Sequence, residues 1–246
     1  MPDWTTPYCG PVPVPETLLR SWNLDPILMG ALAAIGLAGI ITLHQQQARA
    51  PRKGAFAVAM ATAIFAFIAP LCALTVALFA VRSLHHLVLL GLLAPALAVA
   101  FPLRRVPIGL SFLALSAALW AWHLPALYAA AWDSIAIYWA MQAALLLPAW
   151  AFWSVALSRQ DDAMTTMGAA LMIAALAGQM GLIGAVLTFA PRPLYPEHLI
   201  GSEAFGLSLM ADQQLAGLVM WVPGMIPLAI LGALLARRGW RQGLAA

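Results

Sequence analysis

The sequence predicts an all-α, polytopic membrane protein in which seven transmembrane helices form a bundle. The first observation behind this prediction is composition: of 246 residues, 9% are charged and 63% are hydrophobic, and the mean hydropathy is +0.89. A soluble domain carries about 25% charged residues, so this chain could not cover a globule with a water-compatible surface. The second observation is that the apolar residues form seven long runs. These properties exclude a soluble enzyme, a disordered chain and a nucleic-acid binder, since the net charge of +3 comes from basic residues scattered along the chain.

A bilayer core needs about 20 consecutive apolar residues as helix. The seven predicted spans are 26–43, 54–80, 85–101, 107–127, 134–157, 163–190 and 211–236. Each run is continuously apolar rather than alternating, which favours helices over the strands of a membrane barrel. Residues 1–25 form a polar, proline-rich tail that is not typical of a cleaved signal peptide, and residues 237–246 form a second tail. The expected organisation is therefore a helical domain over 26–236 with a short tail on each side.

Small residues in the sixth span indicate close helix packing. Gly178, Gly181 and Gly184 recur at intervals of three residues. Small side chains of this kind let helix backbones approach each other in lipid.

Basic residues are divided unequally between the two sides of the predicted bundle. One side carries nine, namely Arg49, Arg52, Lys53, Arg104, Arg105, Arg159, Arg237, Arg238 and Arg241. The other side carries the remaining three, which are Arg20, Arg82 and Arg192. The side with more basic residues is expected to be cytoplasmic. The N-terminus is then outside and the C-terminus inside, as an odd number of spans requires.

Polar groups at membrane depth are costly, so each of them is a candidate functional residue. They gather at the predicted outer ends of the spans: His85 and His86 open the third, His123 closes the fourth, and Asp212 opens the seventh. Arg82 lies one turn before His86 and shares its helical face. The other members of this polar set are Gln142, Gln213, Gln214 and Met220. We expect these side chains to meet in one pocket near the extracytoplasmic surface.

The side chains of this set are typical ligands of a transition metal. Imidazole, carboxylate and thioether groups bind such ions, and sulfur combined with imidazole suits copper, especially Cu(I). The pattern indicates a copper site with His86, His123 and Asp212 as ligands, and with Met220 and His85 as weaker candidates. An interhelical polar network without metal is the competing interpretation.

Arg82 bears on both interpretations. Without a metal, its guanidinium is expected to pair with the carboxylate of Asp212. A cation entering the cluster would have to break this pair.

Two other function classes remain open. A haem-binding membrane electron carrier would use His86 and His123 as axial ligands. A membrane transporter would need a polar path, and the predicted inner half of the bundle is nearly free of ionisable residues. No enzyme is expected, because no local motif presents an activated nucleophile.

The remaining cysteine and histidine residues carry weaker signals. Cys9 and Cys72 are too few for a disulfide framework or a metal cluster made of cysteines alone. Cys9 lies in the outer tail, and Cys72 lies in the predicted outer half of the second span. Cys9 is considered as a thiol donor or a lipidation site, and neither role is favoured. His44 and His198 are interpreted as loop residues.

Several runs of residues resemble the multi-spanning CtaG family of cytochrome c oxidase assembly proteins. They are Gly184–Pro196 (GAVLTFAPRPLYP), Ala211–Gly224 (ADQQLAGLVMWVPG), His123–Tyr128 (HLPALY), and His86 with Ala94 and Pro95. The similarity extends from about residue 65 to residue 230, and the Asp-Gln-Gln run with its Met-Trp pair is the most specific part.

The resemblance implies a role in the maturation of haem–copper oxidases and in the handling of copper. The polar set that it carries over is His86, His123, Asp212, Gln213, Gln214 and Met220. Two positions depart from the family pattern, because Arg82 and Gln142 stand where many members have histidine. The expected protein is a multi-pass protein of the bacterial cytoplasmic (inner) membrane that holds or relays copper at the extracytoplasmic face. Its expected partner is an oxidase subunit or another assembly factor.

Overall fold

The computed structural model describes residues 7–103, 106–158 and 162–244, and every regular element in these ranges is helical. The helices are α1 (Pro26–Gln45), α2 (Ala50–Phe67), α3 (Leu71–Ala77), α4 (Phe79–Val88), α5 (Ala94–Ala100), α6 (Ile108–Trp122), α7 (Pro125–Asp133), α8 (Ile135–Ala156), α9 (Ala163–Phe189), α10 (Leu199–Ala204) and α11 (Leu209–Leu244). A π-helical turn over Leu89–Leu93 joins α4 to α5, and short 3-10 turns occupy Leu18–Arg20 and Pro196–His198. The predicted all-α class is confirmed.

Five helical segments are each long and apolar enough to cross a bilayer: Pro26–Gln45, Phe79–Ala100, Ile135–Ala156, Ala163–Phe189 and Leu209–Leu244. Two bent pairs, α2 with α3 and α6 with α7, have the same property, with bends of 42° and 80°. The described chain therefore has seven membrane-spanning segments if each bent pair counts as one, which agrees with the predicted number.

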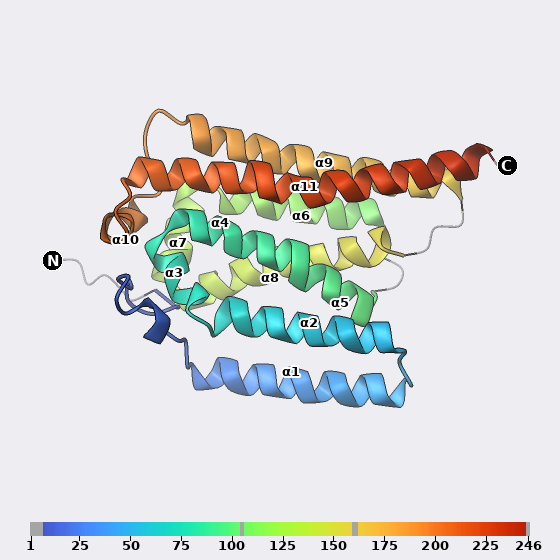
Figure 1. The fold of residues 1–246 in the computed structure, drawn as a ribbon, viewed down its shortest axis with the longest axis horizontal. Helices are drawn as coiled ribbons and strands as arrows, with labels where there is room; N and C mark the ends of the chain where they lie inside the picture. Colours follow the sequence, from blue (N-terminus) through green and yellow to red (C-terminus); the bar gives the residue numbers. More distant parts are fainter. Residues whose placement is uncertain (1–6, 104–105, 159–161, 245–246) are drawn as a thin grey trace.

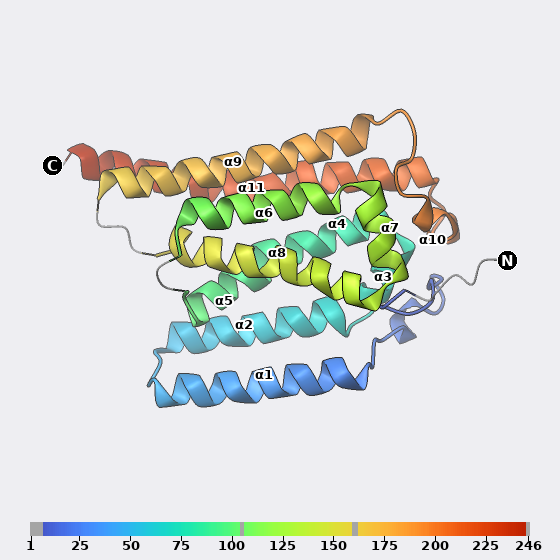
Figure 2. The same cartoon turned by 180° about the vertical axis from the view of Figure 1, so that it is seen from behind.

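The helices run side by side along the long axis of the molecule (Figure 1). The longest two, α9 and α11, lie together at one edge, and α1 lies at the other edge. Figure 2 shows α6 and α8 across the opposite face. The short helices α3, α7 and α10 gather at one end of the bundle, beside the N-terminal tail. We call this end the tail end.

The main hydrophobic core joins residues of α3 to α9 and α11, whereas α1 and α2 contribute to two smaller clusters. In α1 only Leu28, Gly39 and Leu43 are buried. The outermost helix is thus attached to the bundle chiefly through α2.

Glycines bring α9 and α11 into close contact, as the small residues of the sixth span predict. A side chain at Gly184 would meet the carbonyl oxygen of Gly217 at 2.7 Å, and one at Gly181 would meet Met225 Sδ at 2.8 Å. The same prediction is wrong for Gly178, which faces open space.

The predicted boundary between the second and third spans is wrong. Helix α3 ends at Ala77, Leu78 is extended (φ −124°, ψ 126°), and α4 begins at Phe79. Gly201 of α10 packs against the backbone of Ala77, and this contact leaves no room for a side chain at Gly201. His85 and His86 consequently lie in the second turn of α4 rather than at the opening of a span.

The fourth predicted span, 107–127, is also not continuous. Helix α6 ends at Trp122, and the chain turns by 80° through His123 and Leu124 before α7. The residue before a proline is pushed out of the helical region, and Leu124, which precedes Pro125, is extended (ψ 123°). His123 therefore stands at a corner at the tail end.

Candidate functional site

Buried polar side chains gather on α4 near the tail end. Arg82, Ser83, His85 and His86 are all buried, with exposed fractions of 4%, 3%, 0% and 7%. Both ring nitrogens of His85 and the Nε2 atom of His86 have no hydrogen-bond partner. Since buried polar atoms are normally hydrogen-bonded, each such atom needs an explanation.

His86 and His123 lie within electrostatic range of each other, although they come from different helices. The Nδ1 atom of His123 is 2.6 Å from the carbonyl oxygen of Leu119. A carbonyl can only accept, so Nδ1 carries the proton and the lone pair of the neutral ring lies on Nε2. Such a bond to the far nitrogen is typical of metal-binding histidines, because it fixes the tautomer and the ring orientation.

His85 takes a different position from its neighbour. Its ring packs edge-on against Phe67 of α2 with the centroids 5.3 Å apart, and the centroid of His86 is 6.0 Å away. His85 therefore packs against α2.

Asp212 is buried at the tail end, but its carboxylate is already engaged. Its Oδ2 accepts the backbone N–H of Phe79 at 2.7 Å, and its Oδ1 accepts that of Ala80 at 3.0 Å. These are orphan donors of the first turn of α4. The expected pair with Arg82 is wrong: among the described residues Arg82 forms no ion pair, and its Nε and Nη1 atoms have no partner.

The other predicted members of the polar set differ in burial and in hydrogen bonding. Gln213 accepts the N–H of Leu194 at 2.6 Å and donates to the carbonyl of Leu187 at 3.2 Å. Met220 is buried in the main core, and Gln214 is exposed. Gln142 is 3% exposed, and neither of its amide atoms has a partner.

No three histidine, cysteine, aspartate or glutamate side chains of the described chain come together as a set of metal ligands. His86 and His123 lie within electrostatic range of each other, whereas the carboxylate of Asp212 accepts the first N–H groups of α4. The imidazoles that remain suit an ion of low coordination number with soft preferences, such as Cu(I).

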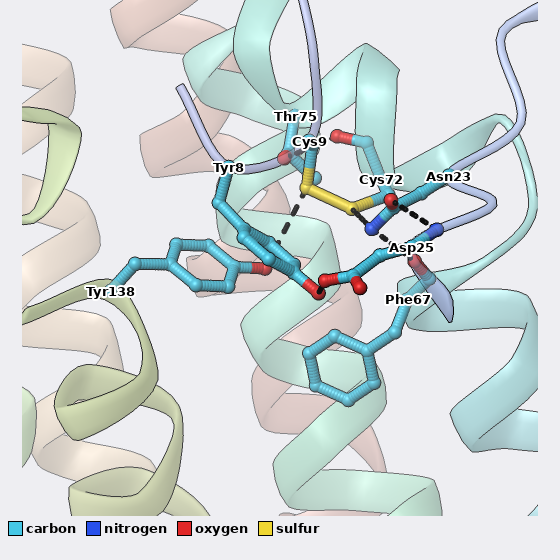
Figure 3. The surroundings of a disulfide bond; sticks show 8 residues. All are labelled: Tyr8, Cys9, Asn23, Asp25, Phe67, Cys72, Thr75 and Tyr138. Atoms are coloured by element: carbon cyan, nitrogen blue, oxygen red, sulfur yellow. Dashed lines mark hydrogen bonds between the residues drawn. A yellow bond between two sulfur atoms is a disulfide. The ribbon is translucent and has the colours of Figure 1, made fainter. Parts of the chain in front are cut away.

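A disulfide bond between Cys9 and Cys72 attaches the N-terminal tail to α3 (Figure 3). Tyr138 Oη lies 3.6 Å from Cys9 Sγ, and the amide of Asn23 bonds to the carbonyl of Phe67 at 3.1 Å. The sequence analysis missed this bond, although it placed both cysteines on the outer side. Because disulfides form in oxidising compartments, that shared location was the available signal.

The sequence analysis also missed the buried position of His198, which it interpreted as a loop residue. It is fully buried, and both ring nitrogens are engaged: Tyr128 Oη is 2.6 Å from Nε2, and the Val76 carbonyl is 3.1 Å from Nδ1. The carbonyl fixes the proton on Nδ1, so the phenol donates to Nε2. Burial, together with the nearby charge of Arg82, lowers the pKa of His198 to about 3. His44, in contrast, is exposed in the last turn of α1.

The comparison with known families decides the class of protein. A model of the cytochrome c oxidase caa3 assembly factor family (Caa3_CtaG) matches residues 106–242. The chain belongs to this family. No curated protein and no solved structure matches it.

Family membership confirms the resemblance seen in the sequence. The matched region, residues 106–242, begins and ends nearer the C-terminus than the region from about residue 65 to residue 230 that shows the resemblance. The matched residues of this CtaG-family chain include His123, Asp212 and Met220, and they begin after α4. Arg82, His85 and His86 therefore lie outside the matched region, and their roles depend on the geometry alone. The family indicates a role in oxidase assembly, and the apolar helices indicate a multi-pass membrane protein.

Proposed function

We propose that the chain assists the assembly of a haem–copper cytochrome c oxidase by holding copper as cargo at its tail end, which faces the extracytoplasmic side of the bacterial inner membrane. The observation that carries the proposal is that His86 and His123 come from two different helices and lie within electrostatic range of each other, while the Nε2 atom of His86 is buried without a hydrogen-bond partner. The partner is an oxidase subunit that receives the metal or another assembly factor. The chain itself carries out no turnover.

Two independent features support the proposed orientation. The disulfide lies at the tail end, and such bonds persist in oxidising compartments. Basic side chains mark the opposite end, with Arg49, Arg52 and Lys53 at the start of α2 and others in the last turns of α11. Cytoplasmic ends of membrane proteins carry this excess. Arg104, Arg105 and Arg159, which also entered the charge count, lie outside the described residues.

The donor chemistry of the site agrees with monovalent copper. Imidazole and thioether groups suit Cu(I), and a site with few ligands releases its ion more readily than a closed one. Met220 is buried among the core residues of α11, and its thioether belongs to the class of soft donor that suits Cu(I). Asp212 has no part in this site, because both of its oxygens are occupied by backbone N–H groups.

The test is the copper content of protein purified after expression with added copper. His86→Ala and His123→Ala are expected to retain at least about tenfold less copper per chain than the parent, since each removes half of the imidazole pair. His44→Ala is the matched control, because His44 is exposed at the other end of the bundle. Equal copper in all four proteins would eliminate this site, and a Soret band in the parent would favour a haem carrier.

The assembly role is tested separately in cells. A deletion strain grown under copper limitation should lose oxidase activity, and the parent gene and His44→Ala should restore it. Normal oxidase content in the deletion strain would overturn the assembly role, whatever the purified protein binds.

A further inference from the structure

Arg82 carries a buried positive charge that no acidic side chain of the described residues offsets. The residue is 4% exposed, and its Nε and Nη1 atoms have no hydrogen-bond partner. The carboxylate of Asp212 is committed to the start of α4, and no other described carboxylate pairs with Arg82. A buried ion without a counter-charge is strongly unfavourable, so arrangements of this kind persist when something neutralises them.

In the part of the chain that the structure describes, the groups in contact with Arg82 are aromatic and uncharged. The guanidinium carbon lies 5.6 Å from the centroid of the Tyr138 ring, and the phenol of Tyr128 is a further neighbour. His85, His86 and His198 lie within electrostatic range of Arg82 and are neutral or cationic. The carboxylates of Glu197 and Asp212 lie within electrostatic range of Tyr128, but neither pairs with Arg82. Ring faces and phenols attract a cation only weakly compared with a full negative charge.

Arg82 also lines a small cavity. The volume of the cavity is about 10 Å³. The other residues of its wall are Pro7, Tyr8, Tyr128, Ala131, Trp132, Tyr138 and Met141. Space of this size holds a single particle about as large as a water molecule. A phosphate, a sulfate or a carboxylate-bearing metabolite is too large for it.

We propose that this cavity is a binding site for a small monatomic anion, a halide such as chloride, which pairs with the guanidinium of Arg82. Among the three phenols of the wall, Tyr8 and Tyr128 already donate to Asp25 and His198. Tyr138, whose hydroxyl has only a long contact of 3.6 Å with Cys9 Sγ, is the phenol that supplies an O–H donor for the same ion. The inference does not depend on copper binding, because it concerns the charge of Arg82 alone.

The N-terminal tail closes the outer side of this site. Pro7 and Tyr8 belong to the cavity wall, and Tyr8 stacks on Tyr138 with the ring centroids 4.9 Å apart. Figure 3 shows this stack beside the disulfide that follows it in the chain. The tail is therefore held over Arg82 by a covalent bond at Cys9.

The experiment measures thermal unfolding of the full chain in detergent while sodium chloride replaces sodium gluconate at constant ionic strength. The unfolding midpoint of the parent is expected to rise in a saturable manner, by about 3–6 °C at a chloride concentration about tenfold above the dissociation constant. Arg82→Met should show no chloride dependence. It should also be at least as stable as the parent in gluconate, because the unpaired charge is gone. Arg20→Gln, which changes an exposed arginine of the tail, should respond as the parent does.

Each remaining outcome counts against the proposal. A parent that unfolds at the same temperature in both salts has no halide site, and a chloride effect that survives in Arg82→Met lies elsewhere. Asp3→Asn tests a counter-ion within the chain: if this variant alone is destabilised while the parent ignores chloride, the carboxylate of Asp3 replaces the proposed anion. A direct measurement uses crystals grown in bromide, in which an anomalous peak is expected beside Arg82 and its absence would overturn the assignment.

Discussion

The buried imidazole of His198 makes the stability of this protein sensitive to acid. His198 has a pKa of about 3 in the folded chain, below its usual value of 6.5, because it is buried and lies near Arg82. Between these two values the unfolded chain binds more protons than the folded one, so stability falls as pH decreases through this window. This loss of stability is absent above about pH 6.5. Within the window, the free energy of unfolding falls by up to about 1.4 kcal/mol for each unit by which the pH decreases. We expect His198→Asn to weaken the fall of the unfolding midpoint between pH 7.5 and 5, whereas His44→Asn, at an exposed position, should match the parent. Identical slopes for His198→Asn and the parent would show that His198 is not the group responsible.

At this scale the sequence predicts which residues are polar and buried, but not which partners they find. His86 and His123 lie within electrostatic range of each other, and their joint role as ligands stays a prediction. Asp212 does not join them, since a carboxylate serves equally well as a metal ligand or as an acceptor for backbone N–H groups. Only the break at Leu78, 134 positions earlier, decides between these uses. No local pattern of residues reveals that break.

Among the elements, α4 depends on a cap supplied by another helix. Its first residues have no capping side chain within the element, and Asp212 of α11 accepts the N–H groups of Phe79 and Ala80 instead. Asp212→Asn removes the negative charge and one acceptor, which should destabilise the fold by about 1–3 kcal/mol. The measurement is the unfolding midpoint in detergent, with Glu203→Gln, exposed in α10, expected to have little effect.

The folded fraction of Asp212→Asn should retain its copper. A normal midpoint with loss of copper would instead restore Asp212 as a ligand.

Hydropathy predicts the elements well where the chain crosses the bundle and poorly where it turns. The first, fifth, sixth and seventh spans match α1, α8, α9 and α11. The second and fourth continue as apolar sequence through bends of 42° and 80°, because α3 and α7 each contribute side chains to the main core, such as Val76 and Tyr128. Apolar composition predicts that a segment is buried, but it does not predict the direction in which the chain runs. The bends place the buried polar side chains of α4 and His123 at the tail end.

The whole molecule combines a covalent clamp at one end with a concentration of basic residues at the other. The Cys9–Cys72 bond closes a loop of 63 residues that contains the tail, α1 and α2. Helix α1 has few buried residues, so this clamp helps to keep the outermost helix beside the bundle. A loop of this length is expected to contribute about 2–4 kcal/mol to stability when it is closed by a disulfide.

The clamp also gives the orientation of the bundle an experimental signature. If the tail end faces the extracytoplasmic side, Cys9 and Cys72 are oxidised in cells with a working dithiol oxidase in that compartment, and denatured protein should react with a maleimide reagent only after reduction. In a strain without this oxidase both thiols should react directly, and in the Cys9→Ser variant Cys72 should react in either strain.

A fluorescent reporter attached after α11 should be active in the cytoplasm, because the basic end is expected to face that side. A reporter active only outside the cell membrane, or thiols that are free in wild-type cells, would reverse the orientation. The copper and halide sites would then face the cytoplasm, where an extracytoplasmic role in oxidase assembly could not be maintained.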